Sequence, residues 1–333
     1  MKLADSRTLK TSARNALAAA FQPPRKLFAI HIAVIAGASL LVNLLSFLLE
    51  QGIVGATGLD GIGTRALLQT FQTILSAVYS VAQPFWQIAL FFVALQVFRG
   101  QTARTDSLTV GFRHLWSVLK LLLLKLLLVM VFSLAVSVVC STVISILSYT
   151  PLAKDMLAFI ESLPASAMTD PYQLMEDPEI MDTLMRAILP IMPFAAVGTL
   201  LGLLPLLYRV RLLDFALADH PEDGPWSALR TSWRLTKGNW KALLRLDLSF
   251  WWFYLLDLLL LALYYADLYL PLQISPTAAF WLCCGAHAVG QIILYSLANP
   301  LVQTTYAAAY DDLYTQMQEE EAQKQTAQTP FQL

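Results

Sequence analysis

Six long apolar stretches dominate this chain and restrict what it can fold into. They run approximately over residues 27–49, 68–97, 118–147, 188–212, 243–263 and 278–297. Each reaches the roughly 20 residues that a helix needs to cross about 30 Å of hydrocarbon. Apolar residues make up 57% of the sequence and charged residues only 14%, well below the quarter or so that is typical of soluble domains. The pattern predicts an all-α, polytopic membrane protein with six transmembrane helices.

The distribution of Lys and Arg predicts the orientation of these helices. Seventeen of these residues lie in the N-terminal segment and in the connections after the second and fourth stretches. The opposite side holds only Arg65, Lys154 and Arg186, together with ten acidic residues. Cytoplasmic segments of membrane proteins carry the excess of Lys and Arg. We therefore expect both termini in the cytoplasm and an acidic loop, residues 148–187, outside.

This topology divides the chain into three parts. Residues 1–26 form a cytoplasmic amphipathic segment, and residues 27–314 form the membrane domain, which includes a cytoplasmic segment over residues 217–241. Residues 315–333 are rich in Glu, Gln and Thr and have little apolar surface to bury, so we expect a disordered cytoplasmic tail there.

A short segment with helical periodicity precedes each odd-numbered span on the basic side. We call each of these segments an elbow. The third elbow has Pro225 at its start, where proline suits the first helical turn, and Gly238 at its end, where glycine suits a helix stop. Its apolar positions are Trp226, Leu229 and Trp233, and its basic positions are Arg230, Arg234 and Lys237. A helix of this kind is expected to lie in the interface plane, with aromatic rings at headgroup depth and cations near anionic lipid.

The two earlier elbows repeat the pattern less clearly. The first sets Leu9 and Ala13 against Lys10 and Arg14, and the second sets Phe112 and Trp116 against Arg113 and Lys120. One interpretation is a threefold repeat of an elbow followed by a transmembrane hairpin. The other is that these segments are ordinary basic loops.

Polar residues within the spans are candidate functional sites. Inserting an ionised side chain at mid-membrane costs about 2.5–3.5 kcal/mol of free energy, so such residues usually serve a purpose. Asp257 lies deep in the fifth span and His287 about ten residues into the sixth, so the two are expected at similar depth. His31 adds a polar group in the first span. An ion-coupled transport site is one interpretation. The favoured alternative is that Asp257 ties neighbouring helices together by hydrogen bonding.

The sequence carries no signature of a known catalytic centre. It lacks HExxH, GxSxG and P-loop motifs, and its three cysteines lie singly or as a pair within apolar spans without clustered histidines. We therefore expect no enzymatic activity, no metal and no cofactor. With a net charge of −1 and its cations confined to one membrane side, the chain is not expected to bind nucleic acid.

The second half of the chain resembles a known family. Its motifs are Ala218-Asp219-His220-Pro221-Glu222, Ser232, Lys237-Gly238-Asn239 and Leu248-Ser249-Phe250, preceded by Phe98-Arg99-Gly100 and Gly111-Phe112. In these motifs the chain is similar to the bacterial membrane proteins grouped as domain of unknown function 975. The resemblance implies a polytopic bacterial membrane fold and assigns no catalytic residues.

These observations together predict a non-enzymatic, multi-pass protein of the bacterial cytoplasmic membrane. Its expected partners are membrane lipids, through the basic elbows, and a membrane protein or a second copy of the chain. The alternative is a small-solute or lipid transporter, or a transporter accessory subunit, that uses the Asp257 and His287 site.

Overall fold

The computed structural model describes residues 1–20, 23–57, 62–147, 204, 207–266 and 275–328. The described residues are predominantly helical and include no strand, as the all-α prediction requires. The chain divides into two compact units, Met1–Leu122 with Arg209–Leu333, and Leu123–Tyr208.

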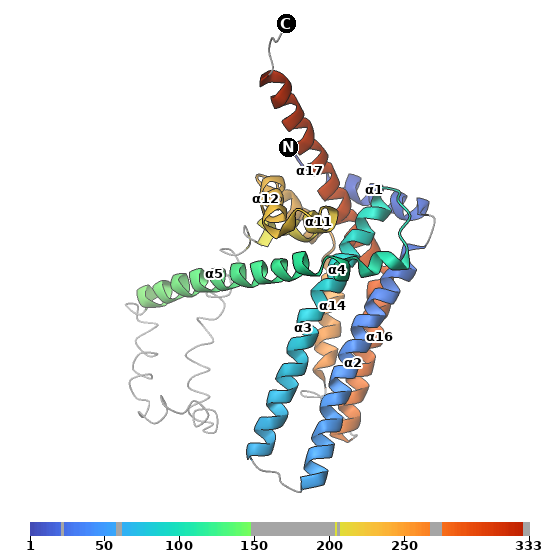
Figure 1. The fold of residues 1–333 in the computed structure, drawn as a ribbon, viewed down its shortest axis with the longest axis vertical. Helices are drawn as coiled ribbons and strands as arrows, with labels where there is room; N and C mark the ends of the chain where they lie inside the picture. The colour runs from blue at the N-terminus through green and yellow to red at the C-terminus, as the bar shows by residue number, and fades with distance from the viewer. Residues whose placement is uncertain (21–22, 58–61, 148–203, 205–206, 267–274, 329–333) are drawn as a thin grey trace. The chain divides into compact units, whose positions relative to one another are not determined.

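Four apolar helices form the bundle of the first unit (Figure 1). They are α2 (Pro24–Thr57), α3 (Ile62–Phe98), α14 (Trp251–Tyr264) and α16 (Pro276–Leu297). Helix α2 packs on α3 and α16, and α16 packs in turn on α14. The start of α16 follows directly from its sequence, because the Ser275 hydroxyl accepts a hydrogen bond from the Ala278 N–H at 3.3 Å and Pro276 occupies the first turn.

The predicted spans correspond to described helices in five of six cases. Four helices are long and apolar enough to cross a membrane, over Pro24–Leu49, Gln69–Phe98, Leu115–Val139 and Thr277–Leu297. A fifth span exists if one bent pair of helices is counted as a single crossing. The predicted fourth span, residues 188–212, and the acidic outer loop, residues 148–187, fall mostly or wholly outside the described residues.

The bent pair corrects the prediction of one continuous fifth helix over residues 243–263. Helix α13 (Trp240–Leu248) and α14 are inclined by 63° at Ser249 and Phe250. The Ser249 hydroxyl donates to the Leu246 carbonyl at 2.5 Å, and the Phe250 side chain is buried at the bend. Helix α13 is amphipathic and α14 is almost wholly apolar, but the apolar residues of α13 run on into those of α14 without a Pro or Gly that would mark the bend.

Further helices gather at the end of the bundle where the N-terminus lies (Figure 1). They are α1 (Ser6–Ala19), α11 (Leu213–Asp219), α12 (Gly224–Thr236) and the long α17 (Asn299–Gln328), and α1 packs along α17. The N-terminal amine pairs with Glu320 of α17 at 2.8 Å. The second elbow is a 3-10 turn, η1 (Thr105–Thr109), followed by the one-turn α4 (Val110–Arg113).

The C-terminal segment corrects the predicted disordered tail. Helix α17 continues to Gln328, so residues 315–328 are helical. The reason lies in contacts far apart in sequence: the Gln316 side chain accepts from the Lys2 N–H at 2.9 Å, and Glu321 pairs with Arg234. The polar composition of this segment predicted disorder because it has little apolar surface to bury. Composition contains no information about the hydrogen-bond partners that the first residues of the chain supply.

Helix α5 (Leu115–Leu147) begins in the first unit and continues into the second. It is mostly apolar, with Lys120 and Lys125 as its only charged residues, and it corresponds to the predicted third span, residues 118–147. Its continuous pattern follows from the sequence, which places Leu, Val and Ile on every face and no Pro or Gly within the helix.

Two glycines allow close helix contacts and a third does not. A Cβ on Gly111 would lie 2.1 Å from the Phe85 carbonyl oxygen of α3, and one on Gly290 would lie 2.3 Å from a methyl of Leu260 on α14. Gly290 therefore lies at a close contact between α16 and α14. Gly37 of α2 has no atom within 4 Å of the equivalent position, so it does not mark a tight contact.

Candidate functional site

A cluster of charged and aromatic side chains joins α3, α11 and α17. Arg99, directly after α3, places Nη1 2.5 Å and Nη2 3.0 Å from the two carboxylate oxygens of Asp219 at the end of α11. Its Nε donates to Asp311 of α17 at 2.8 Å. Gly100 follows with φ of +69°, a backbone conformation that favours glycine and lets the chain turn away from α3. Two of the motifs on which the sequence resemblance rests therefore meet in one ion pair.

Aromatic residues complete this first cluster. Tyr310 of α17 is fully buried, and its hydroxyl donates to Asp219 at 3.2 Å. The His220 ring lies 3.1 Å from the Tyr314 hydroxyl and 3.4 Å from Asp219. Burial, together with the charge of Asp219, raises the pKa of Tyr310, so its hydroxyl stays protonated and continues to donate. The Asp219 hydrogen bond likewise raises the pKa of Arg99, which keeps the guanidinium charged.

A second cluster lies at the bend between α13 and α14. Arg211 Nη2 lies 3.0 Å from Asp247 of α13 and 3.2 Å from the Tyr254 hydroxyl of α14. Tyr254 and Tyr306 both donate to the same oxygen of Asp247, and the Arg211 guanidinium lies 4.5 Å from the Tyr306 ring centre. Burial and the Asp247 charge raise the pKa of Tyr306. The cluster therefore holds the bend by charge-assisted hydrogen bonds.

The first elbow supplies a further support for the same bend. Lys10 of α1 donates from Nζ to the Ser249 carbonyl at 2.7 Å and lies 4.0 Å from the Phe250 ring centre. Partial burial, and then the charge of Arg14, lower the pKa of Lys10. Leu9 and Ala13 are buried, as the predicted apolar face of this helix requires.

The third elbow, α12, places its two tryptophans differently from the prediction. Trp226 is 68% exposed and Trp233 42% exposed, on the same face as the exposed Arg230, Arg234 and Lys237. The opposite face is buried and consists of Pro225, Ala228, Leu229, Ser232, Leu235 and Thr236. The predicted separation of Trp226 and Trp233 from the cations is therefore wrong, whereas Leu229 is buried as expected.

The reason for this arrangement is hydrogen bonding by the small polar residues of α12. The Ser232 hydroxyl donates to the Arg209 carbonyl at 2.7 Å, and Thr236 donates to the Ser232 carbonyl at 2.7 Å. These contacts determine which face of α12 is buried. The buried face carries two hydroxyls, and for that reason a hydropathy pattern predicts that it faces solvent. Arg234 forms an ion pair with Glu321 of α17.

The second elbow also exposes an aromatic ring beside cations. Trp116 is 70% exposed, and Phe112, Arg113 and Lys120 are exposed near it. The other side of the Phe112 ring packs on α3, with its centre 5.5 Å from Phe85 and 5.1 Å from Trp86. Gly111 makes this packing possible, because any side chain there would meet the α3 backbone.

Two half-buried polar residues of the bundle, Asp257 and His287, have partners on neighbouring helices. Asp257 of α14 accepts a hydrogen bond from the Tyr295 hydroxyl of α16 at 3.1 Å. His287 of α16 places Nδ1 2.8 Å from the Leu260 carbonyl of α14, and its ring centre is 5.2 Å from that of Tyr264. Asp257 and His287 thus lie on the same pair of helices, each with its own partner.

His31 lies on α2 and is buried. Its ring contacts Trp86 edge to face, with the ring centres 6.5 Å apart. No hydrogen-bond partner of Nδ1 is found among the described residues. Trp86 in turn contacts Phe112, so His31 belongs to the aromatic packing between α2, α3 and the second elbow.

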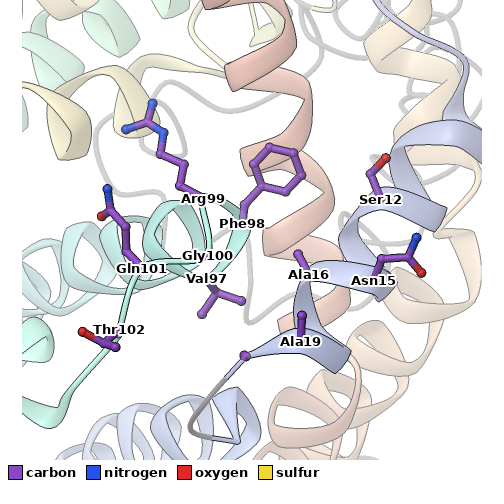
Figure 2. Close-up of a pocket in the computed structure, with 11 residues that line it drawn as sticks. Ser12, Asn15, Ala16, Ala19, Val97, Phe98, Arg99, Gly100, Gln101 and Thr102 are labelled. Carbon is purple, nitrogen blue, oxygen red and sulfur yellow. The ribbon is translucent and has the colours of Figure 1, made fainter.

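A shallow cavity of about 510 Å³ lies between α1 and the turn after α3. Figure 2 shows Ala16 and Ala19 of α1 on one side and Val97 and Gly100 on the other, with Arg99 directed away from α1. The Arg99 guanidinium is paired with Asp219 and Asp311 and is therefore not available to a ligand in this cavity. Within the described part of the chain, no three His, Cys, Asp or Glu residues come together as a metal site would require.

Sequence reasoning identified Asp257, His287, His31 and the elbow cations, but it missed both charged clusters. The signal that was available is the set of motifs shared with the family, since Arg99, Asp219, Asp247 and Asn239 lie in or beside them. Asn239 shows why such a position matters: its Oδ1 accepts from the Leu3 N–H at 3.2 Å and its Nδ2 donates to the Leu235 carbonyl at 3.0 Å.

Comparison with known proteins gives one match. A family described as "Protein of unknown function (DUF975)" matches residues 4–316, which confirms the resemblance inferred from the motifs. No curated protein and no solved structure matches the chain.

Proposed function

The chain belongs to the DUF975 family, whose function is unknown, and we propose that it is a non-enzymatic protein of the bacterial cytoplasmic membrane that binds anionic lipid. The proposal assumes six spans with both termini in the cytoplasm, as the excess of Lys and Arg on one side favours. The basic elbows would then face the cytoplasmic leaflet, where anionic lipid produces a negative surface potential.

The observation that carries this proposal is the exposed face of α12. Trp226 and Arg230 are one helical turn apart, and Trp233 and Lys237 repeat the pair on the next turns. Indole rings favour the headgroup region, and each cation near an anionic surface contributes about 1 kcal/mol. A face that offers both groups together fits a headgroup layer better than it fits bulk water.

The second elbow supports the same proposal independently. Trp116 is as exposed as Trp226, and Arg113 and Lys120 are exposed close to it in sequence. The first elbow contributes less, because Lys10 is committed to the bend between α13 and α14. We therefore assign the lipid surface to the second and third elbows.

The charged clusters favour a structural role over a catalytic one. Asp219 is shared by Arg99 and Tyr310, and Asp247 by Arg211, Tyr254 and Tyr306. Each carboxylate is thus engaged by side chains from other segments of the chain. These contacts hold helices together at the end of the bundle.

Binding of phosphatidylglycerol to the purified full-length protein tests the proposal. The measurement is lipid retention by native mass spectrometry in detergent, compared with phosphatidylcholine. The double variant Arg230→Gln, Lys237→Gln is expected to lower phosphatidylglycerol affinity by up to about 1 kcal/mol per charge, or roughly fivefold each, and to leave phosphatidylcholine unchanged. Lys324→Gln, at an exposed cation of α17 outside the elbows, is the matched control.

Two results would contradict the proposal. One is equal affinity of the wild-type protein for the two lipids, and the other is the same loss in Lys324→Gln as in the elbow variant. The same mass spectra also give the oligomeric state of the protein. A dimer would support the other expected partner of these faces, a second copy of the chain, and co-purified protein would support a membrane-protein partner.

A second candidate function is transport of a small solute or lipid, or service as a transporter accessory subunit. The observation that favours it is the pair Asp257 and His287, which place two polar side chains within the contact between α14 and α16. Each already has a structural partner, and for that reason we place this function second.

A further inference from the structure

A polar cavity lies between the membrane-spanning helices, at the end of the bundle remote from the elbows. Its volume is about 620 Å³, within the range of about 300–1,000 Å³ that small-molecule sites occupy. Four helices contribute to it: α2, α3, α14 and α16, which pack around one another in Figure 1. It is separate from the elbows and from the Arg99 and Arg211 clusters.

The walls of the cavity carry uncharged hydrogen-bonding side chains. Carboxamides come from Asn43 of α2 and from Gln69 and Gln72 of α3, and hydroxyls come chiefly from Thr73 of α3 and Tyr264 of α14. Each carboxamide offers two donors and an acceptor. Such groups are rare in apolar spans because they are costly in hydrocarbon without partners. Their meeting at one cavity from three helices provides a surface that can form hydrogen bonds with an occupant.

The side chains of Asn43 and Thr73 use only part of their hydrogen-bonding capacity in contacts at the cavity. The Asn43 amide donates to the Tyr264 hydroxyl at a long 3.4 Å, and the Thr73 hydroxyl donates to the Gln69 carbonyl of its own helix at 2.8 Å. The Thr73 oxygen therefore keeps its acceptor capacity. Gln69 and Gln72 belong to the exposed residues of α3 at the cavity.

Aromatic rings lie among these polar groups. Phe47 of α2 and Phe280 of α16 line the cavity, and Trp281 stands edge to face with Phe47, with their ring centres 5.7 Å apart. Ring faces carry partial negative charge and attract the weakly positive C–H groups of a bound molecule. Carboxamides, hydroxyls and ring faces together match a ligand with alternating hydroxyl and C–H groups.

We infer that this cavity binds an uncharged polyol, the chemistry of a free sugar or of a sugar headgroup on a lipid. No charged side chain is among the described residues that line it, so an ionic ligand would lose its hydration without a countercharge. A polyol instead exchanges its bonds to water for bonds to amides and hydroxyls. The inference does not depend on lipid binding by the elbows, because the two surfaces share no residue.

Calorimetric titration of the full-length protein in nanodiscs tests the inference. The probes are sucrose as a free sugar and monoglucosyl diacylglycerol as a glycolipid, with gluconate and glucosamine as charged comparisons. We expect one of the uncharged probes to bind and the charged ones to bind at least tenfold more weakly. Binding of sucrose identifies a free solute as the source, and binding of the glycolipid alone identifies a headgroup.

Two substitutions and one control locate the site. Gln72→Leu and the nearly isosteric Thr73→Val are each expected to weaken binding of the uncharged probe by at least fivefold. Gln291→Leu makes the same change on α16, 14 residues beyond Thr277 of the cavity wall and about 21 Å along the helix, and should leave affinity unchanged. Elution volume and melting temperature establish that each variant is folded.

The inference is overturned if neither uncharged probe binds the wild-type protein, or if a charged probe binds as well. It is equally overturned if Thr73→Val, folded by both criteria, binds as tightly as the wild type. An equal loss in Gln291→Leu would also overturn it, since the effect would then be general to the bundle.

Discussion

Arg99 and Asp219 lie 120 residues apart in the sequence and form a bidentate ion pair, with Nη1 to Oδ1 at 2.5 Å and Nη2 to Oδ2 at 3.0 Å. The pair joins the end of α3 to the end of α11, and Asp311 connects both to α17. Bidentate pairs of this kind give direction as well as energy. Arg99 is therefore the residue through which three segments distant in sequence acquire their mutual positions.

Replacement of Arg99 is expected to destabilise the protein. Arg99→Gln leaves the mostly buried Asp219 without its charge partner and should lower the free energy of unfolding by about 2–4 kcal/mol. Arg99→Lys keeps the charge but loses the planar fork, so about half that loss is expected. Thermal unfolding in detergent, followed by tryptophan fluorescence, measures both. Arg7→Gln on the exposed side of α1 is the control, and an equal loss there would contradict the role of Arg99.

Gly111 offers a sharp test of packing between the second elbow and α3. Gly111→Ala places a Cβ 2.1 Å from the Phe85 carbonyl oxygen, and separating the two segments is expected to cost about 1–3 kcal/mol. Gly37→Ala is the matched control, because nothing lies within 4 Å of its Cβ and alanine favours a helix by up to about 1 kcal/mol. Chemical unfolding of both variants should show opposite signs, and a neutral Gly111→Ala would refute the contact.

Substitutions of Asp257 distinguish a structural role, in which it links α14 to α16 by a hydrogen bond, from a role in transport. Asp257→Asn keeps an oxygen that accepts from Tyr295, so folding should be nearly unchanged, whereas Asp257→Leu should cost about 0.6–2 kcal/mol. Tyr295→Phe should cost about as much as Asp257→Leu, since either change removes the same bond. Uptake driven by a pH gradient in proteoliposomes is the decisive measurement. A flux that disappears in Asp257→Asn while the variant stays folded would establish the transport alternative.

The proposed orientation can be tested in intact cells. In a background with Cys140, Cys283 and Cys284 changed to Ala, we expect Ser166→Cys, in the predicted outer loop, to react with an impermeant thiol reagent from outside. Ser227→Cys, at an exposed position of α12, should react only after the cells are opened. Ser232 is unsuitable for this purpose because it is fully buried. Labelling of Ser227→Cys from outside would reverse the topology.

The buried tyrosines predict a loss of stability in alkali. The folded protein raises the pKa of Tyr306 and of Tyr310 above the unfolded value, which is about 10. Their contribution is complete below pH 10 and is lost as pH rises further, because the unfolded chain then releases protons that the folded chain keeps. The slope should reach about 1.4 kcal/mol per pH unit for each tyrosine.

Phenylalanine variants isolate this effect. Tyr306→Phe and Tyr310→Phe should each flatten the decline in melting temperature between pH 9 and 11, by comparison with the wild type. Tyr265→Phe, at an exposed tyrosine, should leave the decline unchanged. A wild-type profile as flat as that of the variants would show that these hydroxyls do not hold their protons as described.

The spans and the beginnings of several helices follow closely from local sequence. Five of the six predicted stretches correspond to described helices, because 20 or more consecutive apolar residues have few other solutions. The clusters around Arg99 and Arg211 could not be predicted in the same way. Their partners are up to 212 residues apart, as with Arg99 and Asp311, and no local periodicity links such positions.

The sequence by itself determined the class of the protein, the amphipathic nature of its elbows and its family, because hydropathy, charge and motifs are properties of neighbouring residues. Only the tertiary structure decided which face of α12 is buried, where the fifth span bends and that α17 extends to Gln328. In each case a polar contact outweighs hydropathy: Ser232 with Arg209, Asp247 with Arg211, and Gln316 with Lys2. Hydrogen bonds between distant segments carry directional free energy that composition does not report, and that is the physical reason these features had to come from the fold.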